Sequence, residues 1–313
     1  MFRSVSLIGL LLAAACSQGD TPEGDSAQNS LANAAKENVA EDAKRGPGQI
    51  IAESTPEDWR TLNPENVLVL ELERGRVIVA LAERLAQGHT AQIKKLAREG
   101  FYDGLSFYRV IDGFVAQGGD VFESREVKTA AKAITAEFDQ PLTDSMKFRP
   151  VSVVDGYAAR VGFINSAAVG VDEAGENVWR LHCPGAVAMA RGNEPDTGGT
   201  EFYIALQPQR YLDRNLTVFG QVVEGMEVIQ TLRRVSPPES PEDDRGETIT
   251  SVKVAADLPE GARPELEILR TDTPLFTEYV ESRSNRPEEF FYFRPNHVDI
   301  CALPIPVRPV TED

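Results

Sequence analysis

Histidine and cysteine are scarce in this chain, whose 313 residues include only three of each. The histidines, His89, His182 and His297, lie far apart and lack the spacing of a zinc site. The sequence also lacks a phosphate-binding glycine loop and the Gly-x-Ser-x-Gly turn that presents a nucleophile. We therefore expect no metal, no cofactor and no nucleotide or acyl chemistry.

Basic residues are in the minority, with 32 Lys and Arg against 49 Asp and Glu and a net charge of -17. Nucleic-acid binding needs a basic surface that neutralises phosphates, so we expect no nucleic-acid partner. Beyond the N-terminus, no apolar run is long enough to span a bilayer. Membrane attachment would therefore depend on a lipid anchor alone.

The N-terminus has the pattern of an export signal. Arg3 is followed by an apolar run from Val5 to Ala15 and then by Cys16. Small residues before a cysteine resemble a bacterial lipoprotein signal, which predicts a signal peptide at 1–15 and lipidation of Cys16. Ser17 then favours attachment to the outer membrane on its periplasmic side. An ordinary cleaved signal peptide with an incidental cysteine remains the alternative.

Residues 16–60 are rich in Ala, Asp, Glu, Asn, Ser and Gly and contain few large apolar residues. Such a segment buries too little surface to offset the loss of chain entropy, so we expect a disordered tether. Random-coil scaling predicts a typical reach of about 35 to 40 Å.

The next 200 residues alternate short β-like runs with turns and two helical patterns. Gly100 is placed to end the first helix. The predicted strands are 67–72, 77–81, 134–138, 185–190, 201–206, 218–223 and 249–254, and the predicted helices are 90–99 and 225–233.

One run, residues 107–120, places an arginine and a glutamine in an otherwise apolar, β-prone stretch. It resembles the first signature of the cyclophilin family of peptidyl-prolyl cis-trans isomerases, Phe-His-Arg-Val-Ile-x-x-Phe-x-x-Gln-Gly-Gly-Asp, with Tyr108 in place of the histidine. Residues 185–204 resemble the second signature of that family, and residues 211–226 a third conserved stretch. The resemblance covers residues 66 to 256.

The resemblance implies a mainly β fold: a closed eight-stranded antiparallel barrel with two capping helices, at 61–256. Its enlarged inserted loop, 141–177, is too apolar to be floppy, so we expect an ordered flap. The C-terminal extension, 257–313, should hold a helix at 275–282, a strand at 290–293 and a polyproline-like end at 304–309. Cys183 and Cys301 could pair in an oxidising periplasm, and the sequence leaves this open.

Peptide-bond rotation faces a barrier of about 18 to 20 kcal/mol. A guanidinium beside a dry apolar pocket lowers this barrier by interacting more strongly with the twisted amide than with either planar form. The resemblance implies that Arg109 is this catalytic group and that a set of residues binds the substrate. These substrate-binding residues are Phe114, Val115, Gln117, Ala190, Arg191, Glu201, Tyr203, Tyr211, Leu212 and Leu216.

The expected partners are Pro-containing segments of exported proteins. Glu201, where the family has glutamine, could either orient Arg109 or hold it in an ion pair. Three readings therefore stay open: an isomerase, a non-catalytic module that binds Pro-containing segments as a chaperone or scaffold, and a structural lipoprotein whose extension carries the function. An occluded pocket or an Arg109–Glu201 pair would favour the second.

Overall fold

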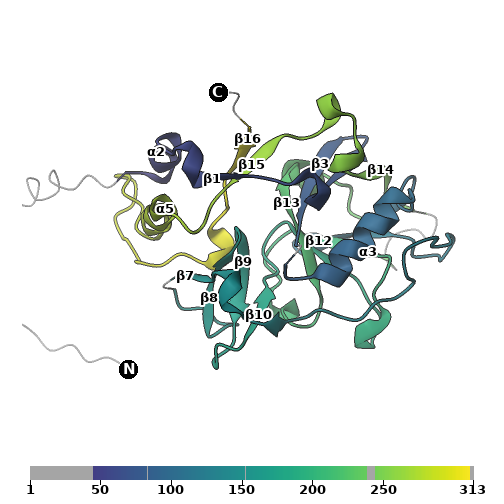
Figure 1. The fold of residues 1–313 in the computed structure, drawn as a ribbon, viewed down its shortest axis with the longest axis horizontal. Coiled ribbons are helices and arrows are strands. Elements are labelled where there is room, and N and C mark those ends of the chain that lie inside the picture. The colour runs from purple at the N-terminus through teal and green to yellow at the C-terminus, as the bar shows by residue number, and fades with distance from the viewer. Residues whose placement is uncertain (1–44, 83, 152, 238–243, 311–313) are drawn as a thin grey trace, which may run out of the picture. The chain divides into compact units, whose positions relative to one another are not determined.

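The computed structural model describes residues 45–82, 84–151, 153–237 and 244–310 (Figure 1). The predicted signal peptide, Cys16 and the first part of the tether, 16–44, lie outside the described residues. The prediction of disorder is wrong for 45–60, which contain helix α2 (Pro47–Ala52) and most of strand β1 (Trp59–Thr61). Ile50 and Trp59 are buried there because they pack against a core that other segments supply.

Eight antiparallel strands close into a barrel, which confirms the predicted fold class. Around the barrel the order is β11-β12-β5-β4-β14-β2-β3-β13, and β13 pairs with β11 to close it. The bounds are β2 Val67–Leu72, β3 Gly75–Leu81, β4 Ser106–Val110, β5 Val115–Gly119, β11 Ala186–Met189, β12 Phe202–Ala205, β13 Val218–Glu224 and β14 Glu247–Val254.

Two helices accompany the barrel, as predicted: α3 (Gln87–Arg98) and the shorter α4 (Met226–Gln230). The apolar face of α3, with Ile93, Leu96 and Ala97, packs into the main core with the inward residues of the strands. Gly100 follows α3 with a φ of +69°, a left-handed conformation that glycine adopts without strain.

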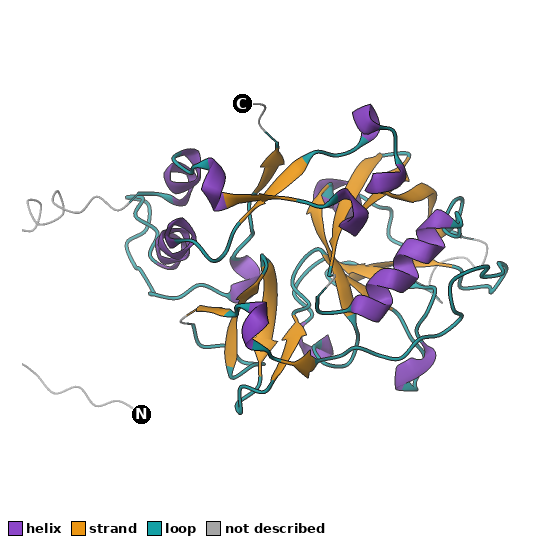
Figure 2. Cartoon of the chain, viewed as in Figure 1, coloured by secondary structure: helices purple, strands orange, loops and turns teal. Residues whose placement is uncertain are grey.

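The insert forms a five-stranded sheet of its own, in the order β6-β10-β9-β8-β7. Figure 2 shows its strands as a group separate from the barrel strands. Their bounds are β6 Gln140–Pro141, β7 Arg149–Val151, β8 Arg160–Ile164, β9 Ala167–Val171 and β10 Asn177–Arg180. The insert is therefore ordered, as expected.

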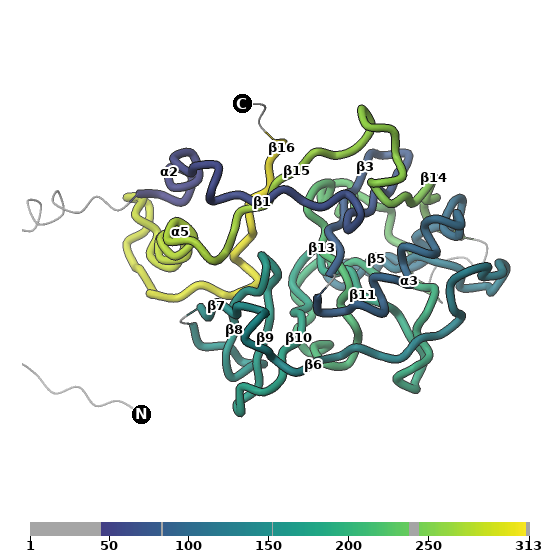
Figure 3. The backbone as a smooth tube through the Cα atoms, in the orientation of Figure 1, coloured from purple at the N-terminus to yellow at the C-terminus, as the bar shows by residue number. Residues whose placement is uncertain are grey.

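The C-terminal extension joins the insert and the N-terminal segment rather than standing apart. Helix α5 (Pro274–Ser284) confirms the predicted helix and packs against α2, and Figure 3 shows these two helices side by side. Strands β15 (Leu266–Leu269) and β16 (Val307–Pro309) form a three-stranded sheet with β1. We call the shared apolar cluster the second core; it includes Ile50, Trp59, Val161, Phe163, Trp179, Leu181, Leu269, Phe276, Tyr279 and Ile300.

A disulfide links Cys183, just before β11, to Cys301 in the extension, with a Cα–Cα distance of 4.9 Å. The pairing that the sequence left open is therefore made. It ties the extension to the segment that leads into the barrel.

Three local predictions differ from the structure. Residues 134–138 form no strand, because their amides bond to loops and side chains, such as Ile134 to the carbonyl of Gly198 and Ala136 to Asp196. Residues 290–293 form a turn with exposed aromatic side chains. The proline-rich end is β16 at 307–309, and Val307 packs on the barrel surface.

Short 3₁₀ turns connect these elements. They are Pro56–Asp58, Pro64–Asn66, Asp144–Met146, Pro195–Thr197, Arg210–Leu212, Ala255–Asp257, Glu260–Ala262 and Ile300–Ala302.

Candidate active site

Strands β4 and β5 bring Arg109 and Gln117 together, because the two residues are paired across the antiparallel ladder. Arg109 Nη1 donates to Gln117 Oε1 at 3.2 Å. The Arg109 guanidinium also lies over the ring of Phe114, with 5.4 Å from Cζ to the ring centroid. The guanidinium is thus held by a neutral amide and an aromatic face, which leaves its charge unneutralised.

Glu201, the residue just before β12, lies in the same group of side chains. Its carboxylate bonds to Tyr108 and Gln117 rather than to Arg109. Gln117 Nε2 donates to Tyr108 Oη at 2.5 Å and to Glu201 Oε2 at 3.2 Å, and Tyr108 Oη donates to Glu201 Oε2. Burial and the bond to Glu201 raise the pKa of Tyr108 well above its usual range, so its hydroxyl remains a donor. Within the described part of the chain, Glu201 forms no ion pair with Arg109.

An apolar patch lies next to Arg109 on the outer side of the barrel. Side chains alternate along β5 and β12, so Ala116 and Phe202 face the main core while Val115 and Tyr203 face the patch. The apolar patch consists of Phe114, Val115, Ala186, Ala188, Ala190, Tyr203, Ala205, Leu212, Leu216 and Val218. It holds six of the predicted substrate-binding residues and, among the described residues, none from the insert.

A buried series of hydrogen-bonded side chains holds the hydroxyl of Tyr203, and the sequence analysis did not predict it. His182 is fully buried; its Nε2 is 2.9 Å from Tyr203 Oη, and its Nδ1 is 3.0 Å from Asp213 Oδ1. Asp213 also accepts from Arg210 Nε at 2.6 Å. The sequence analysis gave His182 no role beyond excluding a zinc site, since its partners lie 21 and 31 residues away in the sequence.

The same series continues into the insert through Asp155. Arg210 donates from Nη1 and Nη2 to the two carboxylate oxygens of Asp155, at 2.7 and 3.0 Å. All three ionic side chains are at least nine-tenths buried. Burial alone would raise the pKa of Asp155, but hydrogen bonds from Arg210 and two backbone amides lower it below its usual range.

The remaining predicted residues lie at the edge of the site. Ala190 donates its amide to the carbonyl of Glu201 at 2.9 Å. The side chain of Arg191 donates to the carbonyl of Asn215 at 2.9 and 3.0 Å, so it holds a neighbouring loop. Tyr211 is 58% exposed and does not belong to the apolar patch.

In the part of the chain that the structure describes, no group of three or more His, Cys, Asp or Glu side chains could hold a metal ion. Across the same residues, no helix is long and apolar enough to cross a membrane.

Comparisons with known proteins agree with this geometry. Residues 67–254 match the family model described as cyclophilin type peptidyl-prolyl cis-trans isomerase/CLD. A probable peptidyl-prolyl cis-trans isomerase of Brucella suis is 33% identical over 195 residues, 62% of this chain and 85% of that protein. Peptidyl-prolyl cis-trans isomerase B of Bacillus subtilis is 32% identical over 51% of this chain and 86% of its own length.

A crystal structure of the cyclophilin AquaCyp293 from Hirschia baltica is similar at a TM-score of 0.67 and 31% identity. The similarity covers 84% of this chain and 97% of that one. The structural similarity covers more of the chain than the family match at 67–254, so it also includes residues outside that range. The chain belongs to the cyclophilin-type peptidyl-prolyl cis-trans isomerases, a family of enzymes.

Proposed function

We propose that the chain accelerates cis-trans isomerisation of X-Pro bonds through Arg109, with the proline ring on the apolar patch. The main observation that supports this proposal is the position of Arg109, which is bonded to Gln117 and stacked on Phe114 at the border of that patch. In the twisted amide, the prolyl nitrogen loses conjugation and becomes a better hydrogen-bond acceptor. A fixed donor at that place stabilises the transition state more than the planar states.

The other predicted residues have roles that follow from their places. Gln117 both holds Arg109 and can bond to the substrate backbone, while Phe114, Val115, Leu212 and Leu216 supply apolar surface. Tyr203 lies in the patch with its hydroxyl bonded to His182, so the ring is fixed in position. The backbone of Ala190 and Arg191 lies along the edge, where an extended substrate would pair.

The non-catalytic alternative rested on two conditions, an occluded pocket or an Arg109 held by Glu201. The insert contributes no described residue to the apolar patch, and Glu201 bonds elsewhere. The absence of an Arg109–Glu201 ion pair favours catalysis over passive binding.

The test is the catalysed exchange rate of an Ala-Pro peptide, measured by NMR exchange with the signal-free chain. We expect acceleration by the wild type and its loss, by roughly a hundredfold or more, in Arg109→Ala, because a fixed transition-state donor is removed. Arg76→Ala is the matched control, since Arg76 lies on β3 in a surface pair with Glu71. No acceleration by the wild type across several residues before proline would move the function to binding alone.

We further propose that the chain acts on exported proteins from a lipid anchor on Cys16 in the bacterial periplasm, on the outer membrane. The Cys183–Cys301 disulfide supports an oxidising compartment. Labelling with palmitate in cells tests the anchor: incorporation should depend on Cys16 and vanish in Cys16→Ala. Incorporation that persists in this variant, or none in the wild type, would contradict it.

A further inference from the structure

A small cavity lies where the barrel, the insert and the N-terminal segment meet, away from Arg109. Its volume is about 80 Å³. We call it the junction cavity. Its lining comes from β1 and the segment after it, from β3 and the loop that follows it, from β13, from the β8–β9 turn and β10 of the insert, and from β15.

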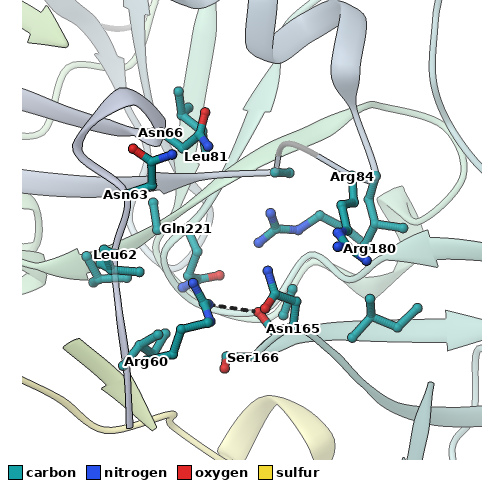
Figure 4. A pocket seen from close by; sticks show the side chains of 17 residues that line it. Arg60, Leu62, Asn63, Asn66, Leu81, Arg84, Asn165, Ser166, Arg180 and Gln221 are labelled. Carbon is teal, nitrogen blue, oxygen red and sulfur yellow. Dashed lines mark hydrogen bonds between the residues drawn. The ribbon is translucent and has the colours of Figure 1, made fainter. Parts of the chain in front are cut away.

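The described lining of the junction cavity includes three arginines and no acidic residue. Arg60, Arg84 and Arg180 belong to three separate segments, and Figure 4 shows their side chains around the same space. Polar groups of Asn63, Asn165 and Gln221 also line it. The chain as a whole has a net charge of -17, so a cavity lined by basic residues and no acidic residue differs from the rest of the molecule.

Arg180 makes this charge costly. Its Nε is buried and has no hydrogen-bond partner. Burial lowers the pKa of Arg180 to about 10, with no carboxylate near enough to oppose the shift. Other buried arginines are paired, as Arg210 is with Asp155 and Asp213. A guanidinium nitrogen that is buried without a partner destabilises a fold unless a ligand supplies the missing acceptor and negative charge.

The tip of the β8–β9 hairpin brings the insert to the cavity. Asn165 and Ser166 both have positive φ, 50° and 66°, as in the tight two-residue turns that suit twisted hairpins. Arg60 Nη2 donates to the carbonyl of Asn165 at 3.3 Å, which fixes one guanidinium against this turn. One of the three guanidinium groups is therefore held by backbone that is itself constrained.

A second, larger cavity of about 440 Å³ adjoins the first and shares Arg60, Arg84, Asn165 and Ser166 with it. Its lining adds Lys147, Arg149 and Arg270, with Asp272 as the one acidic group among the described lining residues. Asp272 is already paired with Arg270 at 3.0 Å. Basic side chains thus line both cavities, and their positive potential would attract anions toward the junction cavity.

We propose that the junction cavity is a binding site for a compact oxyanion of the phosphate or sulfate class, held by Arg180 together with Arg60 and Arg84. The cavity has room for roughly two to three water molecules, which suits one such anion and excludes a peptide or a nucleotide base. Guanidinium groups match the oxygens of phosphate and sulfate in pairs. The bound anion would join the barrel to the insert.

The test is calorimetric titration of the signal-free chain in a low-salt buffer without oxyanions, using inorganic phosphate, sulfate and pyrophosphate, with sodium chloride at matched ionic strength as the reference. We expect saturable binding of at least one oxyanion and a rise in Tm that chloride does not reproduce. In Arg180→Gln, affinity should fall roughly tenfold to a hundredfold. Arg286→Gln, a surface variant in the extension, should bind as the wild type does.

Arg180→Met gives a second readout. Without oxyanion its Tm should exceed that of the wild type, because an uncompensated charge is replaced by an apolar side chain of similar length. With oxyanion its Tm should not change. If Arg180→Gln does not fold, Arg84→Gln takes its place in the titration. The proposal is overturned if no oxyanion binds the wild type at millimolar concentration, or if the Arg180 variant binds as tightly as the wild type.

Discussion

Arg109 in the barrel and Arg210 beside it differ in what holds them. Arg210 lies between the carboxylates of Asp155 and Asp213, and all three side chains are buried. Arg109 has a neutral amide as its hydrogen-bond partner and remains half-exposed at the apolar patch. The positive charge of Arg210 is consumed by the fold, whereas that of Arg109 remains available to a substrate. Partners, more than residue type, therefore separate the structural arginine from the one that we propose as catalytic.

The largest effect on stability is expected at Arg210. Arg210→Met leaves Asp155 and Asp213 buried without their cation, which should lower the free energy of unfolding by about 3 to 5 kcal/mol. Denaturant unfolding measures this loss. Arg76→Met, which breaks a surface pair with Glu71, should cost about 0 to 1 kcal/mol. Equal losses in the two variants would contradict the contrast.

The disulfide should rank next. Cys301→Ser opens a crosslink between residues separated by 118 positions, and we expect a loss of about 2 to 5 kcal/mol. The effect should disappear when both proteins are measured with reductant, because the wild type then lacks the crosslink as well. A loss that persists under reduction would mean that packing at Cys301, and not the bond, stabilises the extension.

Gln117→Leu tests how far the position of the Arg109 guanidinium depends on its hydrogen bond to Gln117. The variant removes the bond to Arg109 Nη1 while leaving Phe114 in place. We expect kcat/KM to fall roughly tenfold, since a charge-assisted bond that orients the donor is lost. The free energy of unfolding should change little by comparison with Arg210→Met. Unchanged kcat/KM would show that Phe114 alone positions the guanidinium.

The smallest effect is expected at Glu201. Glu201→Gln restores the residue usual in the family and keeps a group that can bond to Tyr108. Because Glu201 does not pair with Arg109, activity should change less than about threefold, within the range of an ordinary surface substitution. A large gain in kcat/KM would show that the carboxylate restrains Arg109 after all.

Much of the barrel and the Arg109 group follow from local sequence. Arg109 and Gln117 stand in one short run whose turn fixes their pairing across β4 and β5. The Asp155–Arg210 pair could not be predicted in this way, because it joins residues 55 positions apart through an insert with no recognisable pattern. The sequence left the disulfide open for the same reason, since it contains no distance between Cα atoms.

The errors have a common physical origin. Large apolar residues such as Ile50 and Trp59 are few and scattered in their segment, so the segment lacks a core of its own. Both residues are nevertheless buried against the second core. Residues 290–293 have aromatic side chains suited to a strand, but Phe290, Tyr292 and Phe293 are 79% or more exposed and find no partner strand. Tertiary context overrides local composition in both cases.

The most direct test of the contrast measures activity and stability in the same two variants. Arg109→Ala should lose the catalysed exchange of an Ala-Pro peptide by roughly a hundredfold or more while its unfolding free energy stays within about 1 kcal/mol of the wild type. Arg210→Met should show the reverse, a large loss of stability with exchange changed only severalfold in the folded protein. Catalysis retained in Arg109→Ala, or lost equally in both variants, would contradict the assignment of Arg109 as the catalytic group.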